Sequence, residues 1–456
     1  MVHAVTHSRF SPPVELERAA SVAPLWVALG LAVGPLVAIG LARFAYALLL
    51  PPMRADLDWS YSQAGAMNAA NAAGYLAGAI FTARLAARHG ERTVYLVGLF
   101  GTAFSLIGCG AGEGFTMLLA LRAAAGFFGA LAFVAGATLA TAAGAGASAE
   151  RQGLTVSIYF AGAGAGVVLS SVIVPLALMD GASGWRWGWL GFGAVSLLAG
   201  LVSLPAVRHR PPRATVRVAS RPATARVSLV AAAIAYTLFG AGYIAYMTFV
   251  IAFLRAEHFA PLTVSTFWTV LGLASVATGF GWGYVLARLP GGWPLAVVLA
   301  MLGIGALVPL VNEGGTIAFL SAVLFGGSLM AAPAAVTLLV RKAHPSATWT
   351  REIGWLTVLF GIGQCIGPLL AGALSDTPSG ERLGLLVSVA ILALAAVIAA
   401  LQRDEEHRRR HTRSLPTLPR LNGRARVIGI RRGRRNPSPL GMRLLRRNLQ
   451  HLNPDP

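Results

Sequence analysis

The chain has 456 residues, of which 56% are hydrophobic and only 12% are charged, and its mean hydropathy is +0.66. Soluble domains carry about 25% charged residues, so this composition disfavours a soluble enzyme. The formal net charge is +20, and Lys342 is the single Lys among 37 basic residues. The two Cys lie inside apolar runs, so we expect no disulfide framework, no metal site and no cofactor.

Twelve predominantly apolar stretches follow one another along the chain. Each is long enough to cross ~30 Å of hydrocarbon, which takes about 20 residues in a helix. They run over approximately 25–50, 62–83, 94–112, 115–141, 153–179, 187–205, 228–254, 264–286, 293–311, 315–340, 353–374 and 383–401. Arg43 and Arg122 are the only charged residues inside them. The sequence predicts an all-α membrane protein with twelve transmembrane helices.

The placement of Arg predicts the orientation of these helices. If both termini are cytoplasmic, the short loops on that side hold fourteen Arg and Lys, and the opposite loops hold four. Cytoplasmic loops of membrane proteins carry such an excess. The polar first 20 residues precede a long span, which indicates a cytoplasmic start and not a cleaved signal peptide. We therefore expect a multi-pass protein of a bacterial-type inner (plasma) membrane.

A basic linker divides the chain into two halves of six spans. Residues 206–227 contain six Arg, three Pro and no acid. The expected organisation is a cytoplasmic N-terminal segment 1–22, a six-helix bundle 23–205, the linker 206–227, a second six-helix bundle 228–402 and a basic, disordered cytoplasmic tail 403–456.

The two halves share a spaced glycine pattern. In the fifth and eleventh stretches, glycine recurs after eight and then three residues, displaced by 201 positions: Gly153, Gly162, Gly166 and Gly354, Gly363, Gly367, the last followed by Pro368. A displacement of 200 also aligns Tyr46 with Tyr246. Duplicated halves are a recurring transporter design, with the substrate site at their interface near the midplane.

The loop between the second and third spans resembles a motif of the major facilitator superfamily. The family pattern is Gly-x-Leu-x-Asp-Arg-x-Gly-Arg-Arg/Lys, and the segment ARLAARHGER matches it at Leu85, Arg88, Gly90 and Arg92. Ala87 stands where the family has an acid that helps to latch the cytoplasmic gate.

Further motifs follow in the order that this family has. The second-half counterpart GYVLARLPGG keeps Arg288, and LLALRAAAGFFG in span four matches an Arg-x-x-x-Gly pattern at Arg122 and Gly126. The first span, GLARFAYALLLPPM, and the second, YSQAGAMNAANAAGYLAGA, are similar to the YbfB/YjiJ-type subgroup.

This resemblance covers roughly residues 25–401. It implies two pseudo-symmetric six-helix bundles, the MFS fold, and secondary active transport by alternating access, as a symporter or an antiporter. It points to a carrier and not an enzyme, and it names no ligand. Roles in gating or helix packing are implied for Arg88, Gly90, Arg92, Gly126, Gly153, Gly162, Gly166, Arg288, Gly354, Gly363, Gly367 and Pro368.

Arg43 and Arg122 are the sharpest candidates for a substrate site. A charge at mid-membrane costs about 2.5 to more than 10 kcal/mol, depending on the reference state, and therefore needs compensation. Both side chains can bind an anionic substrate, because the guanidinium fork suits a carboxylate or a phosphate. The alternative is that each binds backbone carbonyls or polar side chains and holds helices in place. We take Arg43 as the principal partner of the substrate charge and Arg122 as an auxiliary one.

The same two interpretations, ligand contact and helix packing, apply to the other polar side chains at membrane depth. Tyrosines can hydrogen-bond or stack on a ligand, and amides more often bond a neighbouring helix. Asn68 is such an amide, and the set predicted to bind substrate is Arg43, Tyr46, Asn71, Arg122, Tyr243, Tyr246 and Gln364.

The favoured function is transport of a small organic anion, with a proton as a potential coupling ion. Efflux of amphipathic or drug-like compounds is an alternative within the class, and a membrane sensor without flux is an alternative outside it. The spans hold no carboxylate, so coupling to protons would involve either an acid at a span end, such as Asp56, Asp58, Glu113 or Asp376, or protonation of the substrate itself.

The partners expected are the lipid bilayer and the small-molecule substrate, and the protein is expected to be a monomer. The tail from Arg403 onward carries fifteen Arg and four acids. It is either a solvated end or a contact for anionic lipid, to which each basic residue adds about 1 kcal/mol. Nucleic-acid binding is disfavoured because the tail has no aromatic residue on which bases could stack.

Overall fold

Apolar runs rich in Ala, Leu and Val form helices throughout the described part of the chain. The computed structural model describes residues 25–144, 148–209, 228–311, 315–345, 348–377 and 380–402, and within these ranges it contains helices and no strand. The described helices belong to one compact unit within Met1–Arg409. The N-terminal segment 1–22, most of the linker and the tail from residue 403 lie outside the described residues.

The first half contains six spans, and the first of them, Leu25–Asp56, changes its helical form along its length. Its parts are α2 (Val33–Pro35), the π-helix η1 (Leu36–Phe44) and α3 (Tyr46–Asp56). The other elements are α4 (Tyr61–His89), α5 (Glu91–Ala111), α6 (Phe115–Ala143), α7 (Ala149–Ala177), the short η2 (Leu178–Asp180) and η3 (Ala182–Gly184), and α8 (Trp185–Arg208).

The second half repeats this arrangement. Its elements are α9 (Val230–Ala256), α10 (Pro261–Arg288), α11 (Trp293–Val311), α12 (Gly315–Leu329), α13 (Ala331–Ala343), α14 (Trp349–Ser375) and α15 (Gly380–Ala400). Helices α12 and α13 together form one span, which is interrupted at Met330.

Eleven helices of the described chain are long and apolar enough to cross a membrane. The twelfth expected span corresponds to α4, which has 29 residues but is not among the eleven. Its composition explains this, because α4 carries Asn68 and Asn71 in its middle and basic residues in its last turn. The prediction of an all-α membrane protein is confirmed, and α4 is the span with the most polar interior.

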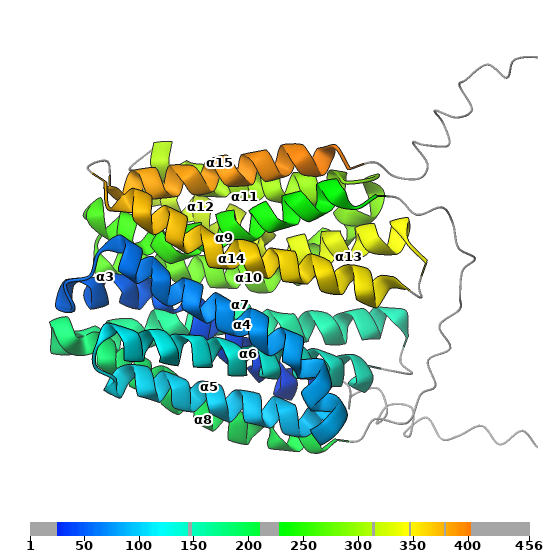
Figure 1. Ribbon diagram of the computed structural model, residues 1–456, viewed down its shortest axis with the longest axis horizontal. Helices are drawn as coiled ribbons and strands as arrows, with labels where there is room; N and C mark the ends of the chain where they lie inside the picture. Colours follow the sequence, from blue (N-terminus) through cyan, green and yellow to red (C-terminus); the bar gives the residue numbers. More distant parts are fainter. Residues whose placement is uncertain are drawn as a thin grey trace, which may run out of the picture. The chain divides into compact units, whose positions relative to one another are not determined.

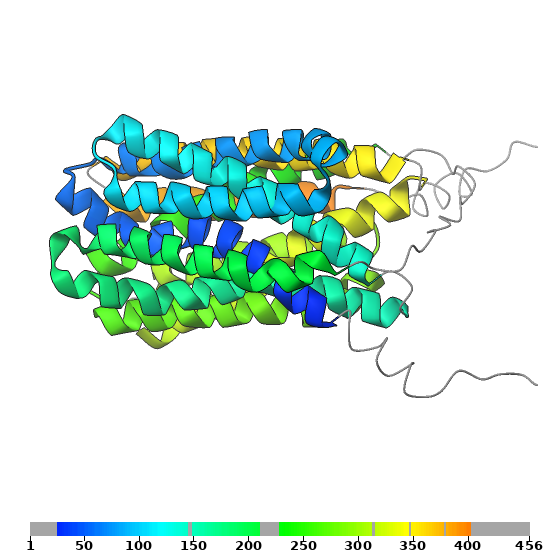
Figure 2. The same cartoon turned by 90° about the horizontal axis from the view of Figure 1, so that it is seen from below.

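The helices of each half pack mainly on one another, and among the described residues three helix pairs make the largest contacts between the halves. In the first half α6 packs between α4 and α5, and in the second half α9 packs against α14 and α15. Across the halves, α4 contacts α14, α7 contacts α10, and α3 contacts α9. The long helices lie side by side in both views (Figure 1, Figure 2). Helix α9 is the most enclosed, with 89% of its membrane window buried.

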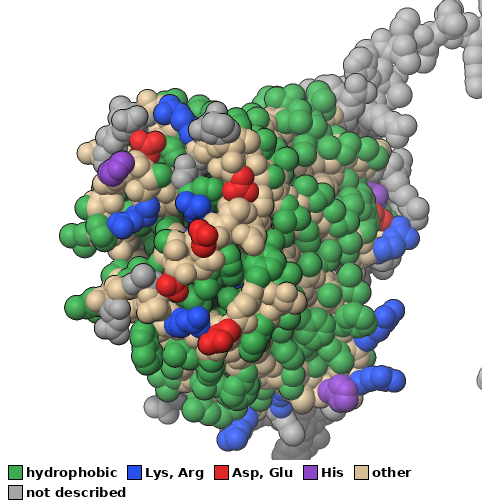
Figure 3. Space-filling model, turned by 60° about the vertical axis from the view of Figure 1, so that its left-hand side comes forward, with side chains coloured by type: hydrophobic (Ala, Val, Ile, Leu, Met, Phe, Trp, Pro, Cys, Tyr) green, Lys and Arg blue, Asp and Glu red, His purple; other side chains and the backbone are tan. Residues whose placement is uncertain are grey.

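The two ends of the bundle differ in what they carry. The start of the first described span and the end of α15 lie at the same end of the bundle (Figure 1, Figure 2), which we call the proximal end. The opposite, distal end carries the turns after α3, α5 and α9. Figure 3 shows the molecule turned so that the distal end comes forward, and acidic and basic side chains gather on this part of the surface.

Candidate substrate site

The first span changes from an α-helix to a π-helix in the segment that carries Arg43. Over Leu36–Phe44 the backbone winds as a π-helix, and the Ala45 amide donates to the Gly40 carbonyl at 2.9 Å. Stretches of π-helix are rare and occur frequently at functional sites. Gly40 permits the close approach of η1 to α7, because a Cβ here would lie 2.5 Å from the Cα of Gly166. Arg43 is in the last turn of this segment and is 2% exposed.

Arg43 connects the two halves of the protein. Its Nε donates to Oδ1 of Asn71 on α4 at 3.1 Å, and its Nη1 donates to Oε1 of Gln364 on α14 at 2.6 Å. The guanidinium also lies over the ring of Tyr75, 4.4 Å from the centroid. Nη2 is buried and has no hydrogen-bond partner among the described residues. The Nη2 edge of the Arg43 guanidinium is therefore not satisfied by the described residues.

Arg122 lies within the first half, on α6. Its Nη1 donates to the carbonyl of Ala42 in η1, and its guanidinium lies 4.9 Å from the ring centroid of Tyr46 and 5.0 Å from that of Trp189. Nε and Nη2 are buried without a partner in the described chain. The contact with a carbonyl of the π-helix matches the interpretation in which this arginine holds helices in place.

Asn71 couples the two arginines. Its Oδ1 accepts from Arg43, and its Nδ2 donates to the backbone carbonyl of Arg122 at 3.2 Å. No carboxylate among the described residues pairs with either guanidinium. Both charges are therefore compensated by amides, carbonyls and aromatic rings, which attract a cation without neutralising it.

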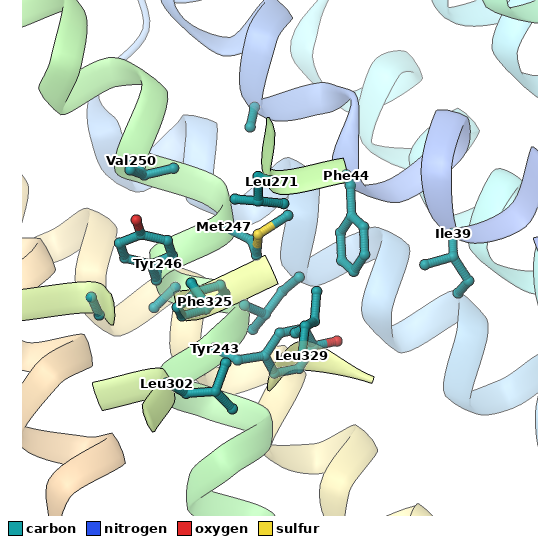
Figure 4. Packing of buried hydrophobic residues seen from close by; sticks show 14 of the residues in the cluster. Ile39, Phe44, Tyr243, Tyr246, Met247, Val250, Leu271, Leu302, Phe325 and Leu329 are labelled. Atoms are coloured by element: carbon teal, nitrogen blue, oxygen red, sulfur yellow. The ribbon is translucent and has the colours of Figure 1, made fainter. Parts of the chain in front are cut away.

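The predicted tyrosines fall in three different places. The hydroxyl of Tyr46 donates to the Ala64 carbonyl at 2.8 Å, and that of Tyr246 bonds Oγ of Ser321 at 2.6 Å. Tyr243 packs its ring edge against Phe44 of the opposite half, with centroids 6.4 Å apart. Figure 4 shows these two rings approaching each other from η1 and α9. Of the three, Tyr243 is the one at the junction beside Arg43.

Two residues near this site escaped the sequence prediction. Tyr75, under the Arg43 guanidinium, lies four residues after Asn71 and hence on the same face of α4, which is the signal that could have identified it. Thr248 accepts from Nδ2 of Asn68 at 2.6 Å, so this amide joins α4 to α9. The Nδ2 of Asn68 thus bonds a neighbouring helix, while its Oδ1 is buried without a partner among the described residues.

Four of the patterned glycines lie at close helix crossings, and two do not. A Cβ at Gly162 or Gly166 would overlap a backbone carbonyl of the first span, and one at Gly363 or Gly367 would overlap a carbonyl of α9. Gly126 meets the Asn71 carbonyl in the same way, and the carbonyl of Pro368 lies against Gly65 on α4. Gly153 and Gly354 have nothing within 4 Å of such a Cβ. The repeated pattern therefore marks equivalent crossings of α7 and α14, except at its first position.

The predicted loop residues lie at the proximal end. Arg88 is exposed at the end of α4, and Gly90 takes φ +81° between α4 and α5. Arg92 donates from Nη2 to the His209 carbonyl at 2.8 Å, and Arg288 lies over the ring of Tyr284 at 3.4 Å. Arg92 thus contacts the start of the linker after α8, and Arg288 contacts its own helix α10.

At the distal end, a carboxylate of one half caps a helix of the other. Asp376 follows α14, and its Oδ1 accepts from the Tyr61 amide at 2.6 Å. Its Oδ2 accepts from the Ser62 amide at 2.9 Å and from the Ser62 hydroxyl at 2.5 Å. The free amides and dipole at a helix N-terminus favour an anion in this position. We call this contact the distal clasp.

We expect Asp376→Asn to lower the midpoint of thermal unfolding at neutral pH. Partial burial raises the pKa of the Asp376 carboxyl, but hydrogen bonds from Ser62 and Tyr61 outweigh this effect, and the pKa ends below its ordinary value. A lowered pKa stabilises the fold above the ordinary carboxyl range, and this stabilisation is lost as pH falls through the lowered pKa. The difference between variant and wild type should therefore shrink below about pH 4.

Asp58→Asn is the matched control for the clasp. Asp58 is an exposed acid in the turn after α3, at the same end of the bundle, and Asn tolerates its positive φ of 52°. Thermal unfolding of this variant should match wild type at every pH. Equal midpoints for Asp376→Asn and wild type at neutral pH would show that the clasp does not stabilise the protein.

Comparison with known proteins identifies relatives over most of the chain. A family model described as "Uncharacterised MFS-type transporter YbfB" matches residues 35–400. A curated protein of Arabidopsis thaliana, "Probable anion transporter 6, chloroplastic", is 30% identical over 132 residues. That match spans 26% of this chain and 25% of the relative, so the chain aligns with about a quarter of that protein.

Solved transporters share the fold at low sequence identity. A D-xylose–proton symporter superposes with a TM-score of 0.65 at 14% identity, covering 85% of this chain and 98% of the other. A bacterial homologue of the human lysosomal transporter Spinster gives 0.62 at 15% identity, with 86% and 97% covered. The nucleoside transporter NupG gives 0.60 at 14%, with 84% and 97% covered. The chain therefore shares the fold of these solved transporters.

Proposed function

Because the chain belongs to the family of YbfB-type major facilitator transporters, we propose that it moves a small organic anion across a bacterial-type inner membrane by alternating access. The membership makes the protein a multi-pass membrane transporter. The anion, the membrane and the role of each residue are the proposal, and they rest on the surroundings of Arg43.

The observation that carries the proposal is the unsatisfied Nη2 of Arg43 at the junction of the halves. A buried donor of a charged group without a partner costs more than a typical hydrogen bond contributes. A carboxylate or phosphate oxygen would satisfy this donor and neutralise the charge at once. Asn71 and Gln364 hold the other two edges of the guanidinium and so leave this one for a ligand.

The charge balance around the site favours the same ligand. Arg43 and Arg122 bring two positive charges to membrane depth, and no acid among the described residues pairs with them. Such a site has a positive potential when it is empty, which attracts anions and repels cations.

The bond between Arg43 and Gln364 supports a link between binding and movement. The donor belongs to the first half and the acceptor to the second, so separation of the halves at this level breaks the bond. A bound anion can replace the lost acceptor, because it adds contacts to the same guanidinium. The anion would then bind one arrangement of the halves more tightly than the other, and this difference in affinity would shift the equilibrium between the joined and the separated arrangement.

Efflux of amphipathic compounds stays an alternative because of the aromatic side chains beside the arginine. Tyr236, Phe239, Tyr243 and Phe360 form a stacked cluster, with Tyr236 and Phe360 centroids 4.7 Å apart. Flat aromatic surfaces suit the rings of drug-like compounds.

Counterflow in proteoliposomes tests the proposal and separates it from the alternatives. Vesicles loaded with a panel of small carboxylates and organophosphates should accumulate a labelled member of the class, and neutral or cationic compounds should not compete. Transport of aromatic cations in place of the anions would favour drug efflux. Ligand binding without flux in any vesicle would favour the sensor.

A thiol at position 215, in the linker 206–227, is expected to be inaccessible from outside intact cells. The excess of Arg in the loops on this side motivates the orientation. The test uses Thr215→Cys in a chain lacking Cys109 and Cys365, and a membrane-impermeant maleimide. Asp58→Cys, in a turn at the distal end, is the control that should be labelled. The reverse labelling pattern would invert the proposed topology.

A further inference from the structure

A groove of about 540 Å³ lies between α5 and α8 at the proximal end, away from the site of Arg43. Its wall is formed by Leu96, Val97, Phe100 and Val207, and its polar lining by Arg92, Thr93 and Arg208. Among the described residues that line it, none is acidic. The groove therefore combines an apolar wall with two guanidinium groups.

Two contacts between the helices bound this groove. At the deeper end the Phe100 ring lies against Gly200, where an added Cβ would come within 3.0 Å of the ring. At the proximal end Arg92 donates from Nη2 to the His209 carbonyl at 2.8 Å. From Arg92 to Phe100 the helix rises about 12 Å, which is the length of several methylene groups.

The groove opens on the surface that faces hydrocarbon. Both α5 and α8 are candidate spans, and Val97 on the wall is 47% exposed. Leu201 and Val202, on the neighbouring turn of α8, are 55% and 61% exposed. Arg92 is the second residue of α5 and Arg208 the last of α8, so both stand where a span meets the headgroup layer.

We propose that this groove binds an anionic phospholipid, with an acyl chain along the apolar wall and the headgroup phosphate at Arg92 and Arg208. Guanidinium groups form strong, charge-assisted hydrogen bonds to phosphate oxygens. Basic pockets between transmembrane helices bind anionic lipid headgroups for this reason. The hydroxyl of Thr93 is a further donor beside the phosphate.

A second groove on the molecule serves as a comparison, because its described lining has no charged side chain. It has a volume of about 400 Å³ and lies between α10, α11 and α12. The described residues that line it are apolar apart from Thr278 and Trp282, and none of them is charged. An acyl chain can occupy either groove, but only the first offers charge to a headgroup. The proposal therefore concerns selectivity for anionic lipid and not lipid contact as such.

Native mass spectrometry of the full-length protein tests this, with equimolar phosphatidylglycerol and phosphatidylcholine carrying the same acyl chains. Wild type should retain phosphatidylglycerol preferentially. Loss of each arginine, in Arg92→Gln and in Arg208→Gln, should reduce the preference on the order of fivefold. Arg208 makes no hydrogen bond to the described residues, so its variant changes charge without breaking a helix contact. The basic tail is present in every variant and contributes the same background.

Two controls distinguish the groove from general attraction of anions. Arg151→Gln removes an exposed arginine at the same end, on α7, and should leave the preference unchanged. Val97→Trp fills the groove and should reduce retention of both lipids. An unchanged preference in Arg208→Gln, or an equal loss in Arg151→Gln, would overturn the proposal. Competition by free glycerol phosphate at the lipid concentration would also overturn it, because the site would then bind a soluble phosphate.

Discussion

Replacing Arg43 by Gln is expected to abolish accumulation of an organic anion in proteoliposomes while folded protein is still recovered from the membrane. The variant keeps hydrogen-bonding capacity toward Asn71 and Gln364 but loses the charge and the free Nη2 donor. Hydrogen bonds to charged groups contribute about 1.5–3 kcal/mol each, so binding of the anion should weaken by about 10- to 100-fold. Equilibrium binding and counterflow measure the two effects separately.

Two further variants distinguish recognition from helix packing. Arg43→Lys keeps the charge but loses the planar fork, so affinity should fall less than in Arg43→Gln. Arg122→Gln removes the bond to the Ala42 carbonyl and the stacking on Tyr46, and it should lower thermal stability more than affinity. If Arg43→Gln folds and carries the same anion with unchanged affinity, Arg43 is a packing residue and the substrate assignment is wrong.

Gly363→Leu is expected to abolish transport and to lower the unfolding midpoint by several degrees. A Cβ at this position would overlap the carbonyl of Thr237, which belongs to the backbone of α9 and cannot move aside as a side chain can. Helix α14 would have to shift away from α9, and Gln364, the next residue, would move away from Arg43 with it. Overpacking of this kind costs typically 1–3 kcal/mol.

The same helix supplies the control for this change. Gly354 occupies the first position of the same glycine pattern but has open space where a side chain would go. Gly354→Leu should therefore insert, fold and transport as wild type does. Normal counterflow by Gly363→Leu would show that the α9–α14 crossing tolerates displacement and that its closeness is not needed for transport.

The sequence was sufficient to locate the helices because membrane depth imposes one strong rule, the exclusion of charge. Helix α4 shows what this rule predicts and what it does not predict. The apolar stretch 62–83 located the span, but the helix continues to His89, because the aqueous end of a span is helical without being apolar. The repeated glycines likewise indicated close crossings, which four of the six occupy. Gly153 and Gly354 could not be told apart from the others, because closeness depends on the partner helix.

The sequence was sufficient to identify the residues of the candidate site but not the contacts between them. Arg43, Asn71 and Gln364 were conspicuous because each places a polar group at membrane depth. Their connection through one guanidinium depends on the contact of α4 with α14, which places Asn71 and Gln364 where both can bond Arg43 of η1. The π-helix that carries Arg43 has no sequence signature comparable to a glycine or proline. Tyr46 and Tyr246 matched in the repeat, but their hydroxyls bond different elements.

The distal clasp gives the two ends of the carrier unequal mechanical roles. If the halves rock about the middle of the bundle, as the proposed alternating access requires, groups at the ends move furthest. Opening the distal end in this way breaks all three bonds to Asp376, which hold the two halves together there. A carboxylate far from the proposed substrate site would then contribute to the barrier to exposing that face, so the speed of turnover and the choice of solute could be changed by different residues.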